Sequence, residues 1–256
     1  MSSPDLQRTQ YRGLTLLTFP ASMLSLYAET SSGNVATPHT SSEVMHATGA
    51  EAVLDGPMFN RCNPNLGYDA QSCGHVLYKH FDLTSGVNIP SSYPNQGVTI
   101  SVLRDGSTQA ASGAAVPSGA VVAVQLYPEL VANGAPVPVR LQDSASRAAL
   151  AIMRDGKLAL VTSSPMTMPD FAQRLAEAGA LYAGYTDGGG STSLETQDGY
   201  TGSSEHRRVL TWLLAKARQS TILQTVKGSP GTTVAVIAGV GAIAGFVWWN
   251  SRRAKR

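Results

Sequence analysis

Residues 155–194 read DGKLALVTSSPMTMPDFAQRLAEAGALYAGYTDGGGSTSL, and this stretch decides the fold. Asp155 and Gly156 stand between two apolar segments, residues 149–153 and 157–162. An Asp-Gly pair between two such segments is a strong signal for a tight turn between antiparallel strands. The beginning of the stretch therefore predicts a β-hairpin.

A helix and a further strand are expected after the hairpin. The tripeptide Met168-Pro169-Asp170 opens a predicted helix over residues 171–178, and Gly179 stands just past its end. Residues 181–186 then form a short predicted strand that leads into DGGGS at residues 187–191. Hairpin, helix and strand in this order predict a sheet-centred α+β domain.

The same criteria extend to the rest of the chain. Residues 60–96 are rich in Asn, Pro, Gly and Ser, and we expect loops over a binding face there. Ser41 and Ser42 predict the start of a short helix at residues 44–47, and a second helix is predicted at residues 207–217. Strands are predicted at residues 14–19, 23–27, 51–54, 98–103 and 119–127.

Composition excludes two classes of protein. The 256 residues are 43% hydrophobic, which is enough for a sizeable core and excludes intrinsic disorder as the main state. Only 14% are charged, and the net charge is +2. Four of the basic residues lie in the last five positions, so the remainder is close to neutral. A nucleic-acid binder needs a basic face, and we therefore expect no nucleic-acid partner.

The C-terminus predicts a membrane anchor. Residues 232–250 carry no charge and reach about 28 Å as a helix, close to the hydrocarbon thickness of a bilayer. Trp248 and Trp249 stand before the basic tail at residues 251–256, as at a cytoplasmic membrane interface. Gly241 and Gly245 form a GxxxG pattern that would let two such helices pair in a homo-oligomer. A buried core helix and a cleaved sorting signal are the alternatives.

These observations give the predicted organisation: a domain at residues 1–218, a linker at 219–231, a transmembrane helix at 232–250 and the basic tail. The positive-inside rule places the body outside the cytoplasm. Residues 11–27 are interrupted by Thr, Pro and Ser and do not resemble a signal peptide, so no export route is evident. A membrane-containing particle, such as a virion, is a second location that the sequence permits.

Cysteine and histidine residues point to no metal site. Cys62 and Cys73 are either a loop-stapling disulfide or two thiols, and no CxxC pattern is present. The five histidines have no spacing typical of a metal site or a triad; His75 and His80, in the expected loop face, are the two worth testing. We predict no cofactor and no structural metal, and leave a divalent cation open.

Four segments in order resemble the phosphodiester glycosidase family. The 155–194 stretch resembles the strand pair, helix and strand that lead to the family's DGGGS motif. Upstream, GAEAVLDGPMF at residues 49–59 is similar to a family segment that ends in NGxxF, with Asp55 in place of the Asn. Arg147 matches an Arg before an apolar strand, and Arg207 with Val209 resembles a later Arg-x-Val. Thr211 stands where the family tends to have Asn.

The resemblance implies a hydrolase that cleaves a sugar-1-phosphodiester in a glycan or cell-envelope polymer. Asp187 and Asp55 would be its two catalytic carboxylates. The predicted substrate-binding residues are two arginines that would grip the phosphate, the backbone amides of three glycines, and the serine of the motif: Arg147, Arg207, Gly188, Gly189, Gly190 and Ser191.

Other interpretations of these residues remain open. The glycines also suit a crowded turn, the two aspartates suit turn caps, and the arginines suit a solvated surface. Ser191 lacks a GxSxG setting and is not expected to be a nucleophile. The rival function is a membrane-anchored structural or glycan-binding protein that keeps the fold without turnover.

Overall fold

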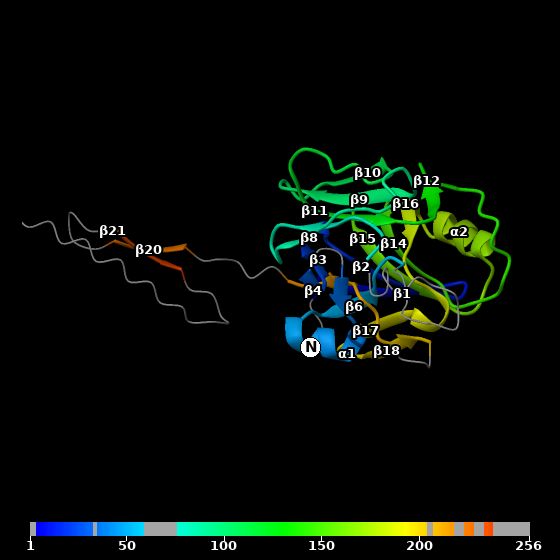
Figure 1. The fold of residues 1–256 in the computed structure, drawn as a ribbon, viewed down its shortest axis with the longest axis horizontal. Helices are drawn as coiled ribbons and strands as arrows, with labels where there is room; N and C mark the ends of the chain where they lie inside the picture. The colour runs from blue at the N-terminus through cyan, green and yellow to red at the C-terminus, as the bar shows by residue number, and fades with distance from the viewer. Residues whose placement is uncertain are drawn as a thin grey trace, which may run out of the picture. The chain divides into compact units, whose positions relative to one another are not determined.

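The computed structural model describes residues 4–32, 35–58, 76–203 and 207–217, together with two strands at 223–227 and 233–237. The chain divides into two compact units, Met1–Ala217 and Arg218–Arg256. The first unit is built on three antiparallel sheets (Figure 1).

The largest sheet has seven strands in the order β1-β2-β15-β14-β16-β12-β13. Its strands are β1 (Gln7–Tyr11), β2 (Leu14–Phe19), β12 (Glu129–Ala132), β13 (Ala135–Pro136), β14 (Ala148–Met153), β15 (Leu158–Ser163) and β16 (Ala180–Tyr185). The predicted Asp-Gly hairpin joins β14 to β15, with Leu150 opposite Leu160. Every residue of β14 and β15 is buried, because both faces of this sheet are covered.

The second sheet has five strands in the order β10-β9-β11-β7-β8. They are β7 (His80–Asp82), β8 (Val87–Ile89), β9 (Val98–Leu103), β10 (Thr108–Ser112) and β11 (Ala120–Leu126). The strands predicted at 98–103 and 119–127 are confirmed as β9 and β11. The loop prediction for residues 60–96 is wrong at β7 and β8, which are only three residues each and so give little sequence pattern.

The third sheet has the order β18-β17-β6-β19-β3. Its strands are β3 (Leu24–Tyr27), β6 (Ala52–Asp55), β17 (Ser193–Thr196), β18 (Gly199–Gly202) and β19 (Trp212–Ala215). The short helix η1 (Ala21–Met23) leads into β3, and a separate hairpin pairs β4 (Glu29–Ser32) with β5 (Val35–Thr37). The central strand of this sheet, β6, ends in Asp55, which places that carboxylate at the end of the sheet.

The helix predicted at residues 207–217 is wrong, because this segment contains β19. Seven of its residues are apolar, and six of them are nearly continuous, a pattern that suits a helix or a strand buried on both faces. In the structure Leu213 and Ala215 join the core between the sheets, while Trp212 and Leu214 pack on the opposite face. Alternating burial on two faces is strand geometry.

In the part of the first unit that the structure describes, two α-helices cover faces of the seven-stranded sheet and of the third sheet. Helix α1 (Ser41–Thr48) is capped by Thr40 in a capping box with Glu43 and packs on β6 and β17. Helix α2 (Met168–Glu177) is capped by Thr167 and packs against β12, β13 and β16; Figure 1 shows it beside β12 and β16. Both α-helices in the described residues of the first unit are thus short, and the predicted sheet-centred α+β domain is confirmed.

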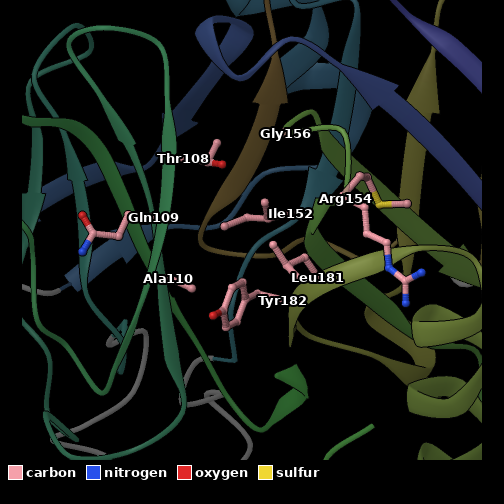
Figure 2. A pocket seen from close by; sticks show the side chains of 9 residues that line it. Thr108, Gln109, Ala110, Ile152, Arg154, Gly156, Leu181 and Tyr182 are labelled. Atoms are coloured by element: carbon pink, nitrogen blue, oxygen red, sulfur yellow. The ribbon is translucent and has the colours of Figure 1, made fainter. Parts of the chain in front are cut away.

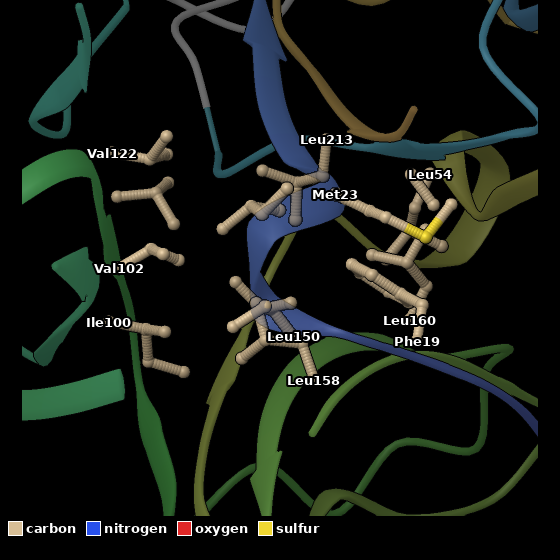
Figure 3. Packing of buried hydrophobic residues seen from close by; sticks show 14 of the residues in the cluster. Phe19, Met23, Leu54, Ile100, Val102, Val122, Leu150, Leu158, Leu160 and Leu213 are labelled. Atoms are coloured by element: carbon tan, nitrogen blue, oxygen red, sulfur yellow. The ribbon is translucent and has the colours of Figure 1, made fainter. Parts of the chain in front are cut away.

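The main core lies where the three sheets face one another. Figure 3 shows Ile100, Val102 and Val122, from β9 and β11, pointing toward Leu150 of β14 and Leu213 of β19. A second cluster fills the space between α2 and the opposite face of the seven-stranded sheet, with Phe171 fully buried. Burial on both faces fixes the ends of β6 and β16, which carry the candidate site.

The second unit is described only as the hairpin of β20 (Leu223–Lys227) and β21 (Thr233–Ile237). β20 falls within the predicted linker, and β21 is a strand at the start of the predicted transmembrane helix. Residues 238–250 of that helix, with Gly241 and Gly245, lie outside the described residues, as does the basic tail. Within the described part of the chain, no helix has the length and apolar character needed to cross a membrane.

Candidate active site

The candidate site forms where strand ends of two sheets meet. Asp55 ends β6, and Tyr185 ends β16 and is followed by Thr186 and Asp187. The Asp187 amide donates a 2.8 Å hydrogen bond to the carbonyl of Gly56. This bond connects the end of the seven-stranded sheet to the end of the third sheet, which contains β6. It brings the two predicted carboxylates close together.

Asp55 is completely buried behind this junction. The Ser193 amide donates to its Oδ1 at 2.9 Å, and the Thr186 hydroxyl donates to its Oδ2 at 3.0 Å. Burial raises the pKa of Asp55 well above its usual value; the Ser193 hydrogen bond opposes this, and the nearby charge of Asp187 adds to it. Asp55 therefore tends toward its neutral form and holds two neighbouring segments together.

Asp187 is the more accessible member of the pair, since it is partly exposed. Its Oδ1 accepts the amide of Gly188 at 3.1 Å, which orients the carboxylate at the start of the glycine turn. With its amide held by Gly56 and its side chain by Gly188, Asp187 is fixed at two points. A fixed, accessible carboxylate is what a reaction at a sugar carbon requires.

Two positions of the glycine turn require glycine for different structural reasons. A Cβ on Gly188 would lie 1.6 Å from the Tyr185 hydroxyl, so only glycine lets that hydroxyl lie against the turn. Gly189 has a φ of +62°, the left-handed region that favours glycine, and no atom would obstruct a Cβ there. The first glycine therefore makes room, and the second sets the direction of the chain.

The glycine amides are partly engaged within the chain. Gly188 donates to Asp187, and Gly189 donates to the carbonyl of Ser146 at 2.8 Å. Residues Gly189–Ser191 form the short helix η4, and the side chain of Ser191 is buried. A phosphate would therefore have to displace existing partners to bind the amides of Gly188 and Gly189, and the predicted binding role of Gly188 to Ser191 stays a prediction.

Tyr185 is a site residue that the sequence prediction missed. Its hydroxyl touches the position of Gly188 and lies close enough to the Arg147 side chain to feel its charge, and the charges of Asp187 and Asp55 also act on it. Burial raises the pKa of Tyr185 to about 12, although Arg147 acts to lower it. The hydroxyl therefore stays protonated as a donor. The available signal was the aromatic residue Tyr185, two positions before DGGGS.

Arg147 lies behind Tyr185, only 2% exposed. Its Nε donates to the carbonyl of Met166 at 3.2 Å, and one Nη donates to both the carbonyl and the carboxylate of Asp143. The structure thus joins Arg147 to the site through Tyr185. Direct binding of a phosphate by the Arg147 guanidinium stays a prediction.

Arg207 and Thr211 lie on the segment that leads into β19. Arg207 is partly exposed, and its phosphate role also stays a prediction. The Thr211 carbonyl accepts the Gly56 amide at 2.8 Å, and its buried Oγ1 has no hydrogen-bond partner. A Cβ on Gly56 would lie 2.2 Å from that oxygen. Thr211 therefore packs directly under the Asp55-Gly56 corner.

The remaining predicted residues lie away from this corner or cannot be placed. Cys62, Cys73 and His75 lie outside the described residues. His80 is fully buried in β7, where burial lowers its pKa to about 4 and its Nδ1 pairs with the carbonyl of Tyr78 at 3.0 Å. A neutral, enclosed imidazole is a structural residue. Among the described residues, no group of three or more His, Cys, Asp or Glu side chains is arranged to hold a metal ion.

A hollow of about 260 Å³ lies away from the carboxylates. Figure 2 shows Thr108 and Ala110 of β10 on one side of it and Ile152, Leu181 and Tyr182 on the other. Leu181 and Tyr182 begin β16, whereas Tyr185 ends it. This hollow is therefore near the opposite end of the strand from the candidate site.

The model of the phosphodiester glycosidase family matches residues 48–215, which include Asp55, Arg147, Tyr185 and Asp187. A comparison with curated proteins finds no match.

Solved structures share the fold. The catalytic domain of zebrafish N-acetylglucosamine-1-phosphodiester alpha-N-acetylglucosaminidase, auto-inhibited by its pro-peptide, has a TM-score of 0.66 at 16% identity, over 84% of this chain and 85% of that one. A candidate exported protein of Burkholderia pseudomallei has a TM-score of 0.56 at 14% identity, over 80% and 74%. A hypothetical protein of Synechocystis has a TM-score of 0.50 at 15% identity, over 82% and 61%.

The family match covers more than half of the chain, and it contains the corner at which the two carboxylates meet. The chain therefore belongs to the phosphodiester glycosidase family.

Proposed function

We propose that this protein hydrolyses the bond between the anomeric carbon of a sugar and the phosphate of a phosphodiester. The C1–O bond breaks, water supplies the new hydroxyl at C1, and a phosphate monoester leaves. The leaving group is a weak base, so its departure needs little protonation. The site must instead hold an anion and stabilise the positive charge that develops at C1.

Asp187 is the residue that we assign to the sugar carbon. Its carboxylate is partly exposed and is held by the Gly188 amide, while its own amide is tied to Gly56. A negative charge fixed beside C1 stabilises an oxocarbenium-like transition state without having to reorganise. The two-point hold on Asp187 is the observation that carries the proposal.

Tyr185 and Arg147 are assigned to the phosphate side. Tyr185 is protonated, and its hydroxyl lies against the glycine turn, where it would donate to a phosphate oxygen. Arg147 places its positive charge behind that hydroxyl. A buried guanidinium strengthens a donor in front of it because the surrounding dielectric is low.

Asp55 is assigned as a positioning residue. It is fully covered, so it reaches the reaction only through Thr186 and Ser193, the two residues that it hydrogen-bonds. Thr186 directly precedes Asp187, and Ser193 starts β17 just after η4. Asp55 thereby fixes both ends of the segment that carries the glycine motif.

The test is release of reducing sugar from a panel of sugar-1-phosphodiesters by the full chain. Asp187→Asn should lower kcat by at least about 100-fold with an unchanged melting temperature. Asp155→Asn is the matched control, because Asp155 is an exposed aspartate in the β14–β15 turn. The variant replaces Asp-Gly by Asn-Gly, which suits the same turn. Equal activity of Asp187→Asn and the wild type would refute the assignment.

One observation favours the rival function, in which the fold binds a glycan without turnover. The carboxylate at position 55 is enclosed where the family segment has Asn, and Arg147 is engaged by Asp143 and Met166. Binding of a sugar phosphodiester with no release of sugar from any member of the panel would establish this rival.

Membrane attachment is a further part of the proposal. It rests on the uncharged run at residues 232–250, the double Trp at its end and the four cations that follow. With a C-terminal anchor, the catalytic unit would act on glycans at the extracytoplasmic surface or on a membrane-containing particle.

A further inference from the structure

An uncharged cluster of three tyrosines lies next to the candidate site. Tyr78 is buried, and the rings of Tyr93 and Tyr127 flank it with centroids 5.8 Å and 6.0 Å away. Tyr93 is 42% exposed and Tyr127 is 37% exposed. Two aromatic rings thus face solvent on a buried aromatic base; we call these three residues the tyrosine platform.

The platform is connected directly to the strand that carries the site. Pro128 follows Tyr127, and its carbonyl accepts the amide of Tyr185 at 3.0 Å. Tyr185 is the residue whose hydroxyl lies against Gly188. The platform therefore borders the active-site end of β16.

The platform is held rigid before any ligand binds. The buried side chain of Gln125 donates to the carbonyls of Tyr93 and Gln96 at 2.8 Å and 2.6 Å, and accepts the amide of Lys79 at 3.2 Å. One side chain thus fixes both segments that carry Tyr78 and Tyr93. Tyrosines on a fixed backbone lose little entropy on binding, because each has only two side-chain torsions.

The chemistry of the platform fits a sugar ring. An aromatic face is electron-rich, and the C–H groups on one face of a pyranose are its complement. Exposed polar residues Ser92, Asn95 and Gln96 adjoin Tyr93 and supply partners for hydroxyl groups, and the segment 90–97 has no charge. Two exposed rings are far smaller than the surface of about 800 Å² per partner that a stable protein complex buries. A saccharide is the ligand of matching size.

We infer that Tyr93 and Tyr127 form a sugar-binding subsite next to the reacting bond, so that the substrate is an extended glycan and not a single sugar phosphodiester. This inference rests on the proposed function for the reaction itself, but the subsite binds sugar whether or not hydrolysis follows. A platform at the edge of the site binds a second sugar unit and thereby holds the scissile unit in place.

The experiment compares oligomers of a repeating sugar-1-phosphate with one, two and four repeats, using the full chain. The wild type should prefer four repeats over one by about tenfold or more in kcat/KM. Tyr93→Ala and Tyr127→Ala should each reduce that ratio three- to tenfold, and the Phe variants should preserve it because they keep the aromatic face. Leu83→Ala, at a comparably exposed apolar residue outside the platform, is the matched control and should leave the ratio unchanged.

A second measurement separates this inference from the proposed function. Calorimetric titration of the Asp187→Asn chain with the four-repeat oligomer should show binding that Tyr93→Ala weakens. Tyrosine-dependent binding without any turnover in the wild type would overturn the hydrolase proposal and leave the subsite. Turnover with a length preference that neither Ala variant changes, or equal loss for all lengths, would overturn the subsite.

Discussion

Replacement of Asp55 by Asn separates a positioning role from a chemical one. Wild-type Asp55 is fully enclosed, with Oδ1 held by the Ser193 amide and Oδ2 by the Thr186 hydroxyl. An Asn side chain has the same shape, its oxygen can keep the Ser193 bond, and its amide can donate to the Thr186 oxygen as a protonated carboxyl does. The substitution therefore removes a buried charge and preserves both contacts.

The expected effect on stability depends on pH. Folding raises the pKa of Asp55 above its usual value of 3.8, so the folded state binds this proton more tightly than the unfolded state. The contribution of Asp55 to stability is therefore fully present below about pH 3.8 and is lost as the pH rises through its folded-state pKa. Asp55→Asn does not titrate, so its advantage should increase over that window and then stay constant.

The magnitude follows from the desolvation of one charged group. An incompletely satisfied buried polar group costs about 1–3 kcal/mol, and a charged group costs more, so Asp55→Asn should recover at least about 1 kcal/mol once the pH exceeds the folded-state pKa of Asp55. For a domain of this size, each kcal/mol raises Tm by roughly 2–4 °C. The measurement is thermal unfolding of both proteins from pH 3 to pH 8, with sugar release measured in parallel.

Activity decides the role of Asp55. If it acts only by position, Asp55→Asn should keep sugar release within about fivefold of the wild type. A 100-fold loss with an intact fold would show that the carboxylate takes part in the reaction. A stability difference that does not change with pH would refute the reasoning about the buried charge.

Three other predictions concern the corner and the C-terminus. Gly188→Ala should lower the free energy of unfolding by about 1–3 kcal/mol, because its Cβ would meet the Tyr185 hydroxyl at 1.6 Å, and Tyr185→Phe should relieve part of this cost in a double-mutant cycle measured by denaturation. Thr211→Val should leave Tm unchanged or raise it, because the buried Thr211 hydroxyl has no partner, whereas Thr186→Val should lower Tm because it removes the donor to the Asp55 Oδ2. Equal effects of the two Thr→Val changes would contradict this difference. The full chain should stay in membranes through a carbonate wash, and deletion of residues 232–250 should abolish that retention; a full chain that is released by the wash would refute the anchor.

Local patterns predicted most of the elements that carry the site. The Asp155-Gly156 turn, helix α2 and strand β16 were readable because each has a start or stop signal beside an apolar run. The segment of β19 was misread because a strand buried on both faces lacks the alternation that identifies a half-exposed strand. The conformation of this segment is determined by its pairing with β6 and β3, which come from distant parts of the chain.

The site was predictable as a set of residues but not as an arrangement. Family-like motifs identified Asp55, Arg147 and Asp187, yet their burial depends on long-range packing that no motif encodes. Asp55 and Arg147 turned out to be enclosed, and Tyr185 took the position between Arg147 and the glycine turn. The sequence predicts Tyr185 only as a strand residue, because the neighbouring residues do not show in which direction its hydroxyl points.

The bond between Asp187 and Gly56 also has a consequence for folding kinetics. Asp55 is separated along the chain from its partners Thr186 and Ser193 by 131 and 138 residues, and Asp55 and Thr186 lie at the ends of two different sheets. Contacts between residues so far apart in the sequence form late in folding, because the chain must lose the conformational entropy of the intervening loop before these contacts can stabilise the fold. Both sheets must be complete before Asp187 is oriented, so the recovery of sugar release during refolding should lag behind the recovery of β-sheet signal. Enzymatic activity would then report the last step of folding in this domain.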